Sequence, residues 1–200
     1  MARRSDHSRE ELRQLIIEEG HRQIAQVGFV NFSARELAKR IGYTVGTIYN
    51  VFGSLDNLML AINGRTLDKW RHYLLLKRAD QREDRLKLAV EAYFEFAIVN
   101  RNCWLTLLDF RLPEDQDVPE TYAAKVEAIM EVVCNEVRRE LPSGHADKAE
   151  AITRSLLATV HGHCFFTLNG TFDVLGETDP IKAALDRVND ALNAFGRIDG

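Results

Sequence analysis

The sequence predicts an all-α protein, and three observations favour this fold class. Only four of the 200 residues are proline, and Pro113, Pro119 and Pro142 stand at apparent loops. Long runs rich in Ala, Leu, Glu and Arg carry apolar residues at helical spacing. We find no alternating apolar and polar run with turn residues that would indicate a sheet.

A first helix is predicted from Ser8 to Val27. Ser8 and Glu11 have the spacing of a capping box, in which each side chain satisfies a backbone N–H at the start of a helix. The residues that recur at helical spacing are Leu12, Leu15, Ile16, Gly20, Ile24 and Val27. Gly28 ends the segment, so the pattern predicts one amphipathic helix.

Residues 33–52 predict a helix-turn-helix. Ser33 and Glu36 repeat the capping-box spacing, and Gly42 supplies the backbone freedom that a sharp turn needs. The apolar face of the first short helix consists of Leu37, Ala38 and Ile41. We expect Ile48 of the second short helix to pack against this face.

The second short helix then directs small polar groups outward. Thr44, Val45, Thr47 and Asn50 are expected to face solvent, close to the cations Arg35, Lys39 and Arg40. Such a surface suits insertion into the major groove of DNA. The alternative interpretation is an ordinary helical hairpin.

This segment also resembles the TetR family of transcriptional regulators over roughly residues 8 to 60. The resemblance rests on Gly28-Phe29, Phe32-Ser33, Leu37-Ala38, Gly42, the core Gly46-Thr47-Ile48-Tyr49-x-x-Phe52, and Leu55 and Leu58. It implies that Thr44, Val45 and Thr47 meet base edges or the groove, and that Tyr49 meets a phosphate. With the neighbouring polar residues, the candidate DNA-binding set is Ser33, Arg35, Tyr43, Thr44, Val45, Thr47, Tyr49 and Asn50.

Two positions depart from the family pattern. Asn50-Val51 stands where the family usually has His or Tyr, and Leu55 replaces a frequent Lys at the start of the next helix. The first change implies a different sequence preference, and the second removes one expected phosphate contact.

We predict two domains, with residues 1–54 forming the DNA-binding domain and residues 55–200 forming a larger helical domain for ligand binding and dimerisation. Residues 1–50 contain eight Lys or Arg and six Asp or Glu, a net charge of +2, so the remainder of a chain of net charge −4 carries −6. A mildly basic N-terminal region on an acidic body indicates a localised DNA surface.

The larger domain is predicted to consist of helices separated by short loops. The expected helices cover residues 55–76, 86–99, 104–112, 120–141 and 146–168, with a last helix beginning at Pro180. The charged stretch 77–85 and the acidic stretch 113–119 are the expected loops.

Two stripes in the last helices predict a homodimer. A stripe of small residues, including Ser155, Ala158 and Gly162, allows close helix approach, and a heptad follows it. The heptad residues are Ile181, Leu185, Val188, Leu192 and Phe195. We favour a four-helix interface between two chains, which is also what the family resemblance implies; in the alternative, both stripes fill the domain's own core.

Aromatic residues on separate helices predict a largely apolar ligand pocket. The candidates are Trp70, Tyr93, Trp104, Phe110, His161 and Phe165. His161 could hydrogen-bond an effector, although a buried His is more often part of a core. The surrounding Val160-His161-Gly162-His163 weakly resembles a C-terminal subgroup of the family named for a Trp-His-Gly motif.

The sequence contains no motif that is typical of an enzyme active site. We find no Gly-rich phosphate loop, no nucleophile motif and no spaced metal-ligand set, so we expect no catalysis, cofactor or metal. Cys103, Cys134 and Cys164 are widely spaced among apolar neighbours, which predicts reduced, buried thiols. Without an apolar signal segment or a stretch of membrane-spanning length, a cytoplasmic location is expected.

The sequence therefore predicts a homodimeric regulator that binds a palindromic operator in double-stranded DNA and responds to a small-molecule effector. We expect a repressor that a largely apolar compound releases from DNA. Two other classes stay open: a dimeric helical binding protein without operator binding, and an all-α enzyme.

Overall fold

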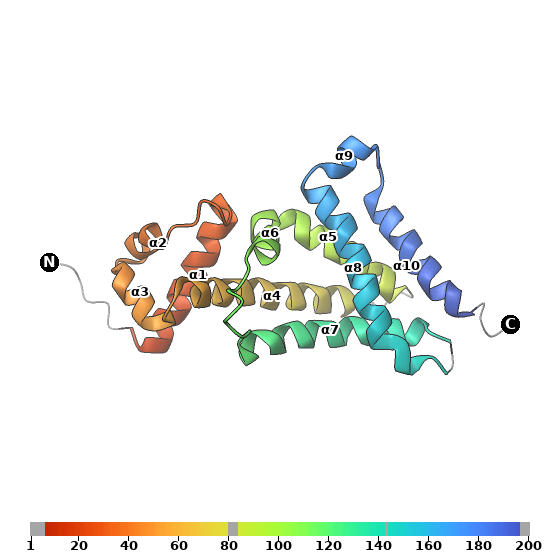
Figure 1. The fold of residues 1–200 in the computed structure, drawn as a ribbon, viewed down its shortest axis with the longest axis horizontal. Helices are drawn as coiled ribbons and strands as arrows, with labels where there is room; N and C mark the ends of the chain where they lie inside the picture. Colours follow the sequence, from red (N-terminus) through yellow and green to blue (C-terminus); the bar gives the residue numbers. More distant parts are fainter. Residues whose placement is uncertain (1–6, 80–83, 143, 197–200) are drawn as a thin grey trace. The chain divides into compact units, whose positions relative to one another are not determined.

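The computed structural model describes residues 7–79, 84–142 and 144–196, and these are helical with no strand. The helices are α1 (Arg9–Val27), α2 (Ala34–Ile41), α3 (Val45–Phe52), α4 (Leu55–Ala79), α5 (Arg85–Val99), α6 (Arg101–Asp109), α7 (Glu120–Glu140), the short 3₁₀ turn η1 (Ala146–Lys148), α8 (Ala149–Leu168), α9 (Thr171–Leu175) and α10 (Pro180–Gly196) (Figure 1). The all-α prediction is confirmed.

The contacts divide the chain into two compact units. The first comprises Met1–Lys69 and Asn100–Ala123, and the second comprises Trp70–Val99 and Ala124–Gly200. Helix α4 contributes residues to both units. The predicted domain boundary at residue 54 therefore stays a prediction, because the contacts group α6 and the start of α4 with α1, α2 and α3.

The first unit has one apolar core. Ile16 and Ile24 of α1, Leu37 of α2, Ile48 of α3 and Leu58 of α4 are completely buried in it. Figure 1 shows α2 and α3 together beside α1, and α6 also packs against α1. Cys103 of α6 joins the same core. Burial of these side chains is what fixes the short helices α2 and α3, because helices of this length are marginal alone.

The second unit is built around α8. Helix α10 lies alongside α8, and α5 contacts both of them (Figure 1). Phe94, Ala184 and Val188 are almost completely buried. The carboxylate of Glu136 is also buried and is paired with Arg78 and Arg139, so this charge is compensated inside the unit.

Several helix boundaries differ from the sequence-based expectations. Helix α4 continues through Ala79, into the stretch predicted as a loop, and residues 80–83 of that stretch lie outside the described residues. Helix α6 begins at Arg101, because Asn100 alone interrupts the helical backbone. Helix α9 was not predicted; glycines with positive φ, Gly170 and Gly176, bound its five residues.

The cysteine prediction is confirmed, since all three thiols are free and buried. Burial raises the pKa of Cys103 to about 11 and that of Cys164 to about 12, so both thiols stay protonated at neutral pH. Over the described ranges, no helix has the length and apolar character needed to cross a membrane.

Candidate nucleic-acid interface

The helix-turn-helix has a cap at the start of α2 and one on each side of its turn. The Ser33 hydroxyl accepts the Glu36 N–H at 3.3 Å at the start of α2, and Gly42 ends α2 in the left-handed conformation with φ 77°. Thr44 is the N-cap of α3 and accepts the Thr47 N–H at 3.1 Å. The helix-turn-helix geometry is therefore set by local hydrogen bonds as well as by the core.

Helix α3 presents one buried and one exposed face. Ile48 and Phe52 are buried in the core of the first unit, whereas Thr44, Tyr49 and Asn50 are exposed. Thr47 is half-buried, and its hydroxyl lies 3.0 Å from that of Thr44. Two hydroxyl groups are thus held together at the start of the helix, where residues of a recognition helix meet base edges.

Val45 is placed differently from the expectation that it faces outward. It is partly buried and packs against the core of the first unit. Helical spacing explains this, because Val45 lies three residues before the fully buried Ile48. Any groove contact of Val45 is therefore limited to the exposed part of its side chain.

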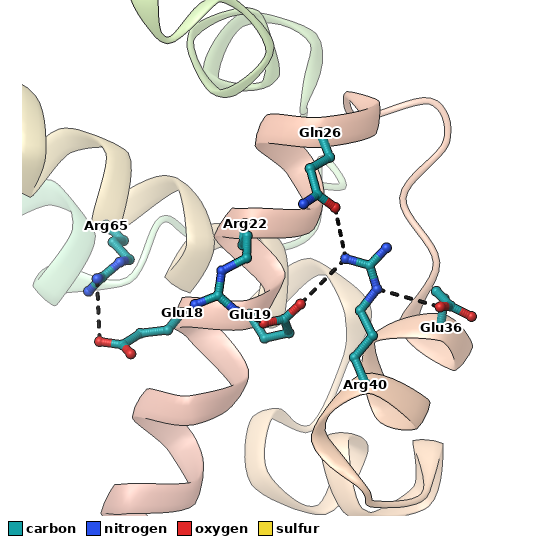
Figure 2. A network of polar contacts seen from close by, with 7 residues as sticks. All are labelled: Glu18, Glu19, Arg22, Gln26, Glu36, Arg40 and Arg65. Atoms are coloured by element: carbon teal, nitrogen blue, oxygen red, sulfur yellow. Dashed lines mark hydrogen bonds and ion pairs between the residues drawn. The ribbon is translucent and has the colours of Figure 1, made fainter.

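The three cations of α2 have different roles. Arg35 and Lys39 are exposed. Arg40 instead donates to Gln26 at 3.0 Å and pairs with Glu19 at 3.4 Å and Glu36 at 3.5 Å, as Figure 2 shows. Arg40 thus joins α2 to α1, which leaves Arg35 and Lys39 as the candidates for phosphate contacts among these three.

The same network extends along α1. Glu19 also pairs with Arg22, and Glu18 pairs with Arg65 of α4 at 3.3 Å (Figure 2). Solvent-accessible ion pairs contribute little to stability, typically about 0–1 kcal/mol each. Here they connect α1 with α2 through Arg40 and with α4 through Arg65.

The remaining candidate, Tyr43, is half-buried directly before the N-cap of α3. Its hydroxyl lies 3.0 Å from Nδ1 of His7. Sequence reasoning missed His7, because 36 residues separate the two partners and no motif relates them.

The predicted ligand residues fall into both units. In the second unit the Trp70 and Tyr93 rings meet edge to face at 5.5 Å, and the Tyr93 hydroxyl bonds to Nδ1 of His161 at 2.5 Å. Burial lowers the pKa of His161, so its imidazole is neutral near pH 7. Phe165 of the same unit packs on Phe166, with ring centroids 6.5 Å apart.

Trp104 and Phe110 belong to the first unit. Trp104 is 4% exposed, and Phe110 packs edge to face on Phe29 with centroids 6.1 Å apart. The structure therefore brings together Trp70, Tyr93 and His161 in the second unit, whereas Trp104 and Phe110 belong to the first unit, where Phe110 packs on Phe29.

The residues predicted to form the dimer interface differ in their solvent exposure. Ser155 and Ala158 of α8 are exposed, and a Cβ added at Gly162 would meet no atom of the described residues within 4 Å beyond its chain neighbours and the adjacent backbone of its own helix. On α10, Ile181, Leu185 and Leu192 are half-buried. Val188 is 1% exposed and packs inside its own chain, as the alternative interpretation of the heptad holds. The Phe195 side chain lies outside the described residues.

Comparison with known proteins gives two family matches. Residues 16–62 match the bacterial regulatory proteins of the tetR family, and residues 86–192 match the tetracyclin repressor-like C-terminal domain. No curated protein matches the chain.

Solved structures share the fold at low sequence identity. A Rhodococcus sp. RHA1 protein of unknown function has a TM-score of 0.73 at 16% identity, covering 96% of this chain and 98% of its own. The multidrug binding protein EbrR, complexed with imidazole, has a TM-score of 0.61 at 17% identity, with coverages of 94% and 96%. The TetR family transcriptional regulator PfmR from Thermus thermophilus has a TM-score of 0.56 at 18% identity, with coverages of 89% and 97%.

Proposed function

Because the chain belongs to the TetR family of DNA-binding transcriptional regulators, we propose that it is a homodimeric repressor of the cytoplasm. In this proposal it binds a palindromic operator and is released by a small, largely apolar effector. It regulates by binding equilibria and catalyses no reaction.

The observation that carries the proposal is the exposed face of α3. Thr44, Thr47 and Asn50 present hydroxyl and amide groups there, and buried Ile48 and Phe52 hold the helix from behind. Hydroxyl and amide side chains are suited to base edges in the major groove. We therefore assign sequence reading to this face.

We assign the flanking residues to the DNA backbone. Tyr49 is 39% exposed on α3, and Arg35 is exposed on the neighbouring helix. Ser33 and Tyr43 lie at the ends of the same two helices. Contacts of such residues with phosphates fix the register of a protein on the duplex but carry no direct sequence information.

We propose that a second copy of the chain covers the exposed small-residue stripe of α8. Ser155, Ala158 and Gly162 leave room for close helix approach, and half-buried Leu185 and Leu192 add apolar area on α10. An isologous contact of this kind would relate two recognition helices by a two-fold axis, as a palindromic operator requires.

The proposed effector site centres on Trp70, Tyr93 and His161. Two aromatic rings with one hydrogen-bonded polar pair resemble the chemistry of pockets that orient apolar ligands through few polar contacts. Phe165 is kept as a neighbour in this proposal, and Trp104 and Phe110 are left out. Release from DNA requires the effector to bind the two conformations of the protein unequally.

The DNA part of the proposal is tested by selection from a pool of random-sequence duplexes. We expect enrichment of a two-fold symmetric sequence with half-sites about 34–36 Å apart, or a multiple of that distance. A dimeric protein that enriches no sequence would support the rival function of a helical binding protein without operator binding.

The proposed effector is tested by screening compounds for those that weaken binding of the protein to the selected duplex. A true effector should weaken operator binding roughly 5–150-fold, and His161→Phe should reduce this response while DNA binding without effector stays near wild type. Asn169→Ala, an exposed change near the end of α8, serves as a control. A full response in His161→Phe would place the effector elsewhere.

A further inference from the structure

Asn57, in the first turn of α4, caps the end of the recognition helix α3. Its backbone N–H donates to the Ser54 hydroxyl at 3.1 Å, and its Nδ2 donates to the Phe52 carbonyl at 3.0 Å. Phe52 is the last residue of α3, and a helix cannot satisfy its own last carbonyls. Asn57 therefore supplies from α4 a hydrogen bond that α3 cannot make for itself.

Gln116, in the acidic loop between α6 and α7, contacts the other side of the Asn57 amide. Its Nε2 donates to Asn57 Oδ1 at 2.9 Å, and both side chains are half-buried. The Gln116 backbone N–H also donates to the Pro113 carbonyl at 3.1 Å, within a turn of the loop. Gln116 lies within residues 86–192 and Asn57 within residues 16–62, the two separately matched segments, yet both residues belong to the first unit.

The two hydrogen bonds of the Asn57 side chain require one orientation of its amide. A backbone carbonyl only accepts, so the amide nitrogen must face Phe52 and the amide oxygen must face Gln116. The reversed amide would place oxygen against the Phe52 carbonyl and nitrogen against the donating nitrogen of Gln116. The Gln116 amide therefore selects the orientation in which Asn57 donates to the end of α3.

We propose that Gln116 is a positioning residue for DNA binding, which acts through Asn57 on the end of α3. The inference rests on the proposed operator-reading face, because Asn50 of that face lies in the last turn of α3. This helix has eight residues, and helices of such length are marginal alone. Loss of the cap should loosen the last turn and displace Asn50 from its base edge, so sequence reading should suffer more than phosphate contacts.

Amide hydrogen exchange of the full chain tests the proposal without DNA. The Gly53 N–H donates to the Tyr49 carbonyl at 2.7 Å and so reports on the last turn of α3. Gln116→Met, of similar length but without a donor, should speed exchange at Gly53 roughly two- to tenfold, the range for one neutral hydrogen bond. The amides of Ile16 and Ile24 in the core should keep their wild-type rates. An unchanged rate at Gly53, or equal acceleration at the core amides, would overturn the proposal.

The direction of the hydrogen bond is tested by the ratio of affinities for the selected duplex and an unselected duplex of equal length, because an added charge changes both affinities alike. In Gln116→Glu the carboxylate only accepts, so it should draw the Asn57 amide nitrogen away from Phe52 and lower the ratio more than Gln116→Met does. Gln116→Lys keeps a donor and should retain a higher ratio than both. Val118→Glu, which adds the same charge at an exposed position of the loop, is the matched control and should keep the wild-type ratio. A Gln116→Glu ratio equal to that of Val118→Glu would contradict the proposal.

A double-mutant cycle tests whether Gln116 acts through Asn57. Asn57→Ala should lower the ratio severalfold, and adding Gln116→Met should lower it no further. Losses that multiply would show that the two residues act separately and would overturn the proposal. If the random pool yields no selected duplex, the proposed operator fails, whereas exchange at Gly53 still decides whether Gln116 positions α3.

Discussion

His21 is a titratable residue buried in the core of the first unit. Its side chain in α1 is 6% exposed, and Nε2 has no hydrogen-bond partner among the described residues. Burial, together with the positive charges of Lys69 and Arg65, lowers the pKa of His21 to about 4. The imidazole is therefore neutral in the folded protein at physiological pH.

This pKa predicts a loss of stability in mild acid. An unfolded His has a pKa of about 6.5, so between that pH and about 4 the unfolded chain binds a proton that the folded chain does not. The free energy of unfolding should consequently fall with decreasing pH across this window, by up to about 3 kcal/mol from His21. Urea unfolding at several pH values measures the slope.

His21→Phe should flatten this slope, because it removes the buried group that resists protonation. His72→Phe, at an exposed position of α4, is the matched control and should leave the slope unchanged. Some dependence should persist in both variants, since burial also lowers the pKa of His161. An undiminished slope in His21→Phe would contradict the assignment.

Between elements, α1 and α4 meet tightly at Gly20. A Cβ added at Gly20 would lie 2.6 Å from Cδ1 and 3.1 Å from Cγ1 of Ile62, a completely buried side chain. Gly20→Ala should therefore cost about 1–3 kcal/mol in overpacking, against a gain of about 1 kcal/mol in helix propensity. Thermal unfolding should show a net destabilised protein.

Ile62→Val removes the Cδ1 that a Cβ at Gly20 would meet most closely. Alone it should destabilise by about 0.5–1.5 kcal/mol, but combined with Gly20→Ala it should cost less than the sum of the two. Gly46→Ala in α3 is the control, because a Cβ there meets Thr44 at an ordinary 3.6 Å. That control should be neutral or stabilising, and simple additivity at Gly20 and Ile62 would contradict the close packing.

Most helices could be predicted from the sequence because their signals are local. The Ser8–Glu11 capping box is present, with hydrogen bonds of 2.7 and 3.2 Å, and α1 spans Arg9–Val27 as its periodicity indicates. Helix α9 escaped prediction, because five residues between two glycines show no measurable period. The predicted end of α4 and the predicted beginning of α6 were wrong, because the charged residues after position 76 and the polar residues 101 and 102 resemble helix breaks although they are helical.

The candidate site was predictable only in part. The cap at Ser33 was predicted from its spacing to Glu36 and is present, whereas the N-cap role of Thr44 was not predicted. The contacts of Arg40 with α1, of His7 with Tyr43, and of Val45 with the core depend on residues distant in sequence. Such contacts are decided by tertiary packing, which no short motif encodes.

For the whole molecule, the main prediction is that two copies of the chain form a dimer. We predict that Leu192→Glu yields monomer in sedimentation velocity, because it places an unpaired charge in the proposed interface. Asn193→Glu, which adds the same charge at the neighbouring exposed position, should remain dimeric. Operator binding should fall with dimerisation, since two linked half-sites bind with avidity. An intact Leu192→Glu dimer would assign this part of α10 to the monomer core.

The net charge is also distributed unevenly over the molecule. Residues 1–50 carry +2, whereas the rest of the chain carries −6. The acidic body should repel phosphates, so binding should depend on the localised surface around α2 and α3. This distribution favours specific binding over general coating of nucleic acid.

The assignment of α3 as a recognition helix is tested by the ratio of affinities for the selected duplex and an unselected duplex at one fixed salt concentration. For the wild type we predict a ratio of at least about 10³. Thr47→Ala should reduce the free energy of discrimination at one base pair by about 1–3 kcal/mol and so lower the ratio. Tyr49→Phe should weaken both affinities equally and leave the ratio unchanged. A wild-type ratio near one would contradict the assignment of α3 as a recognition helix.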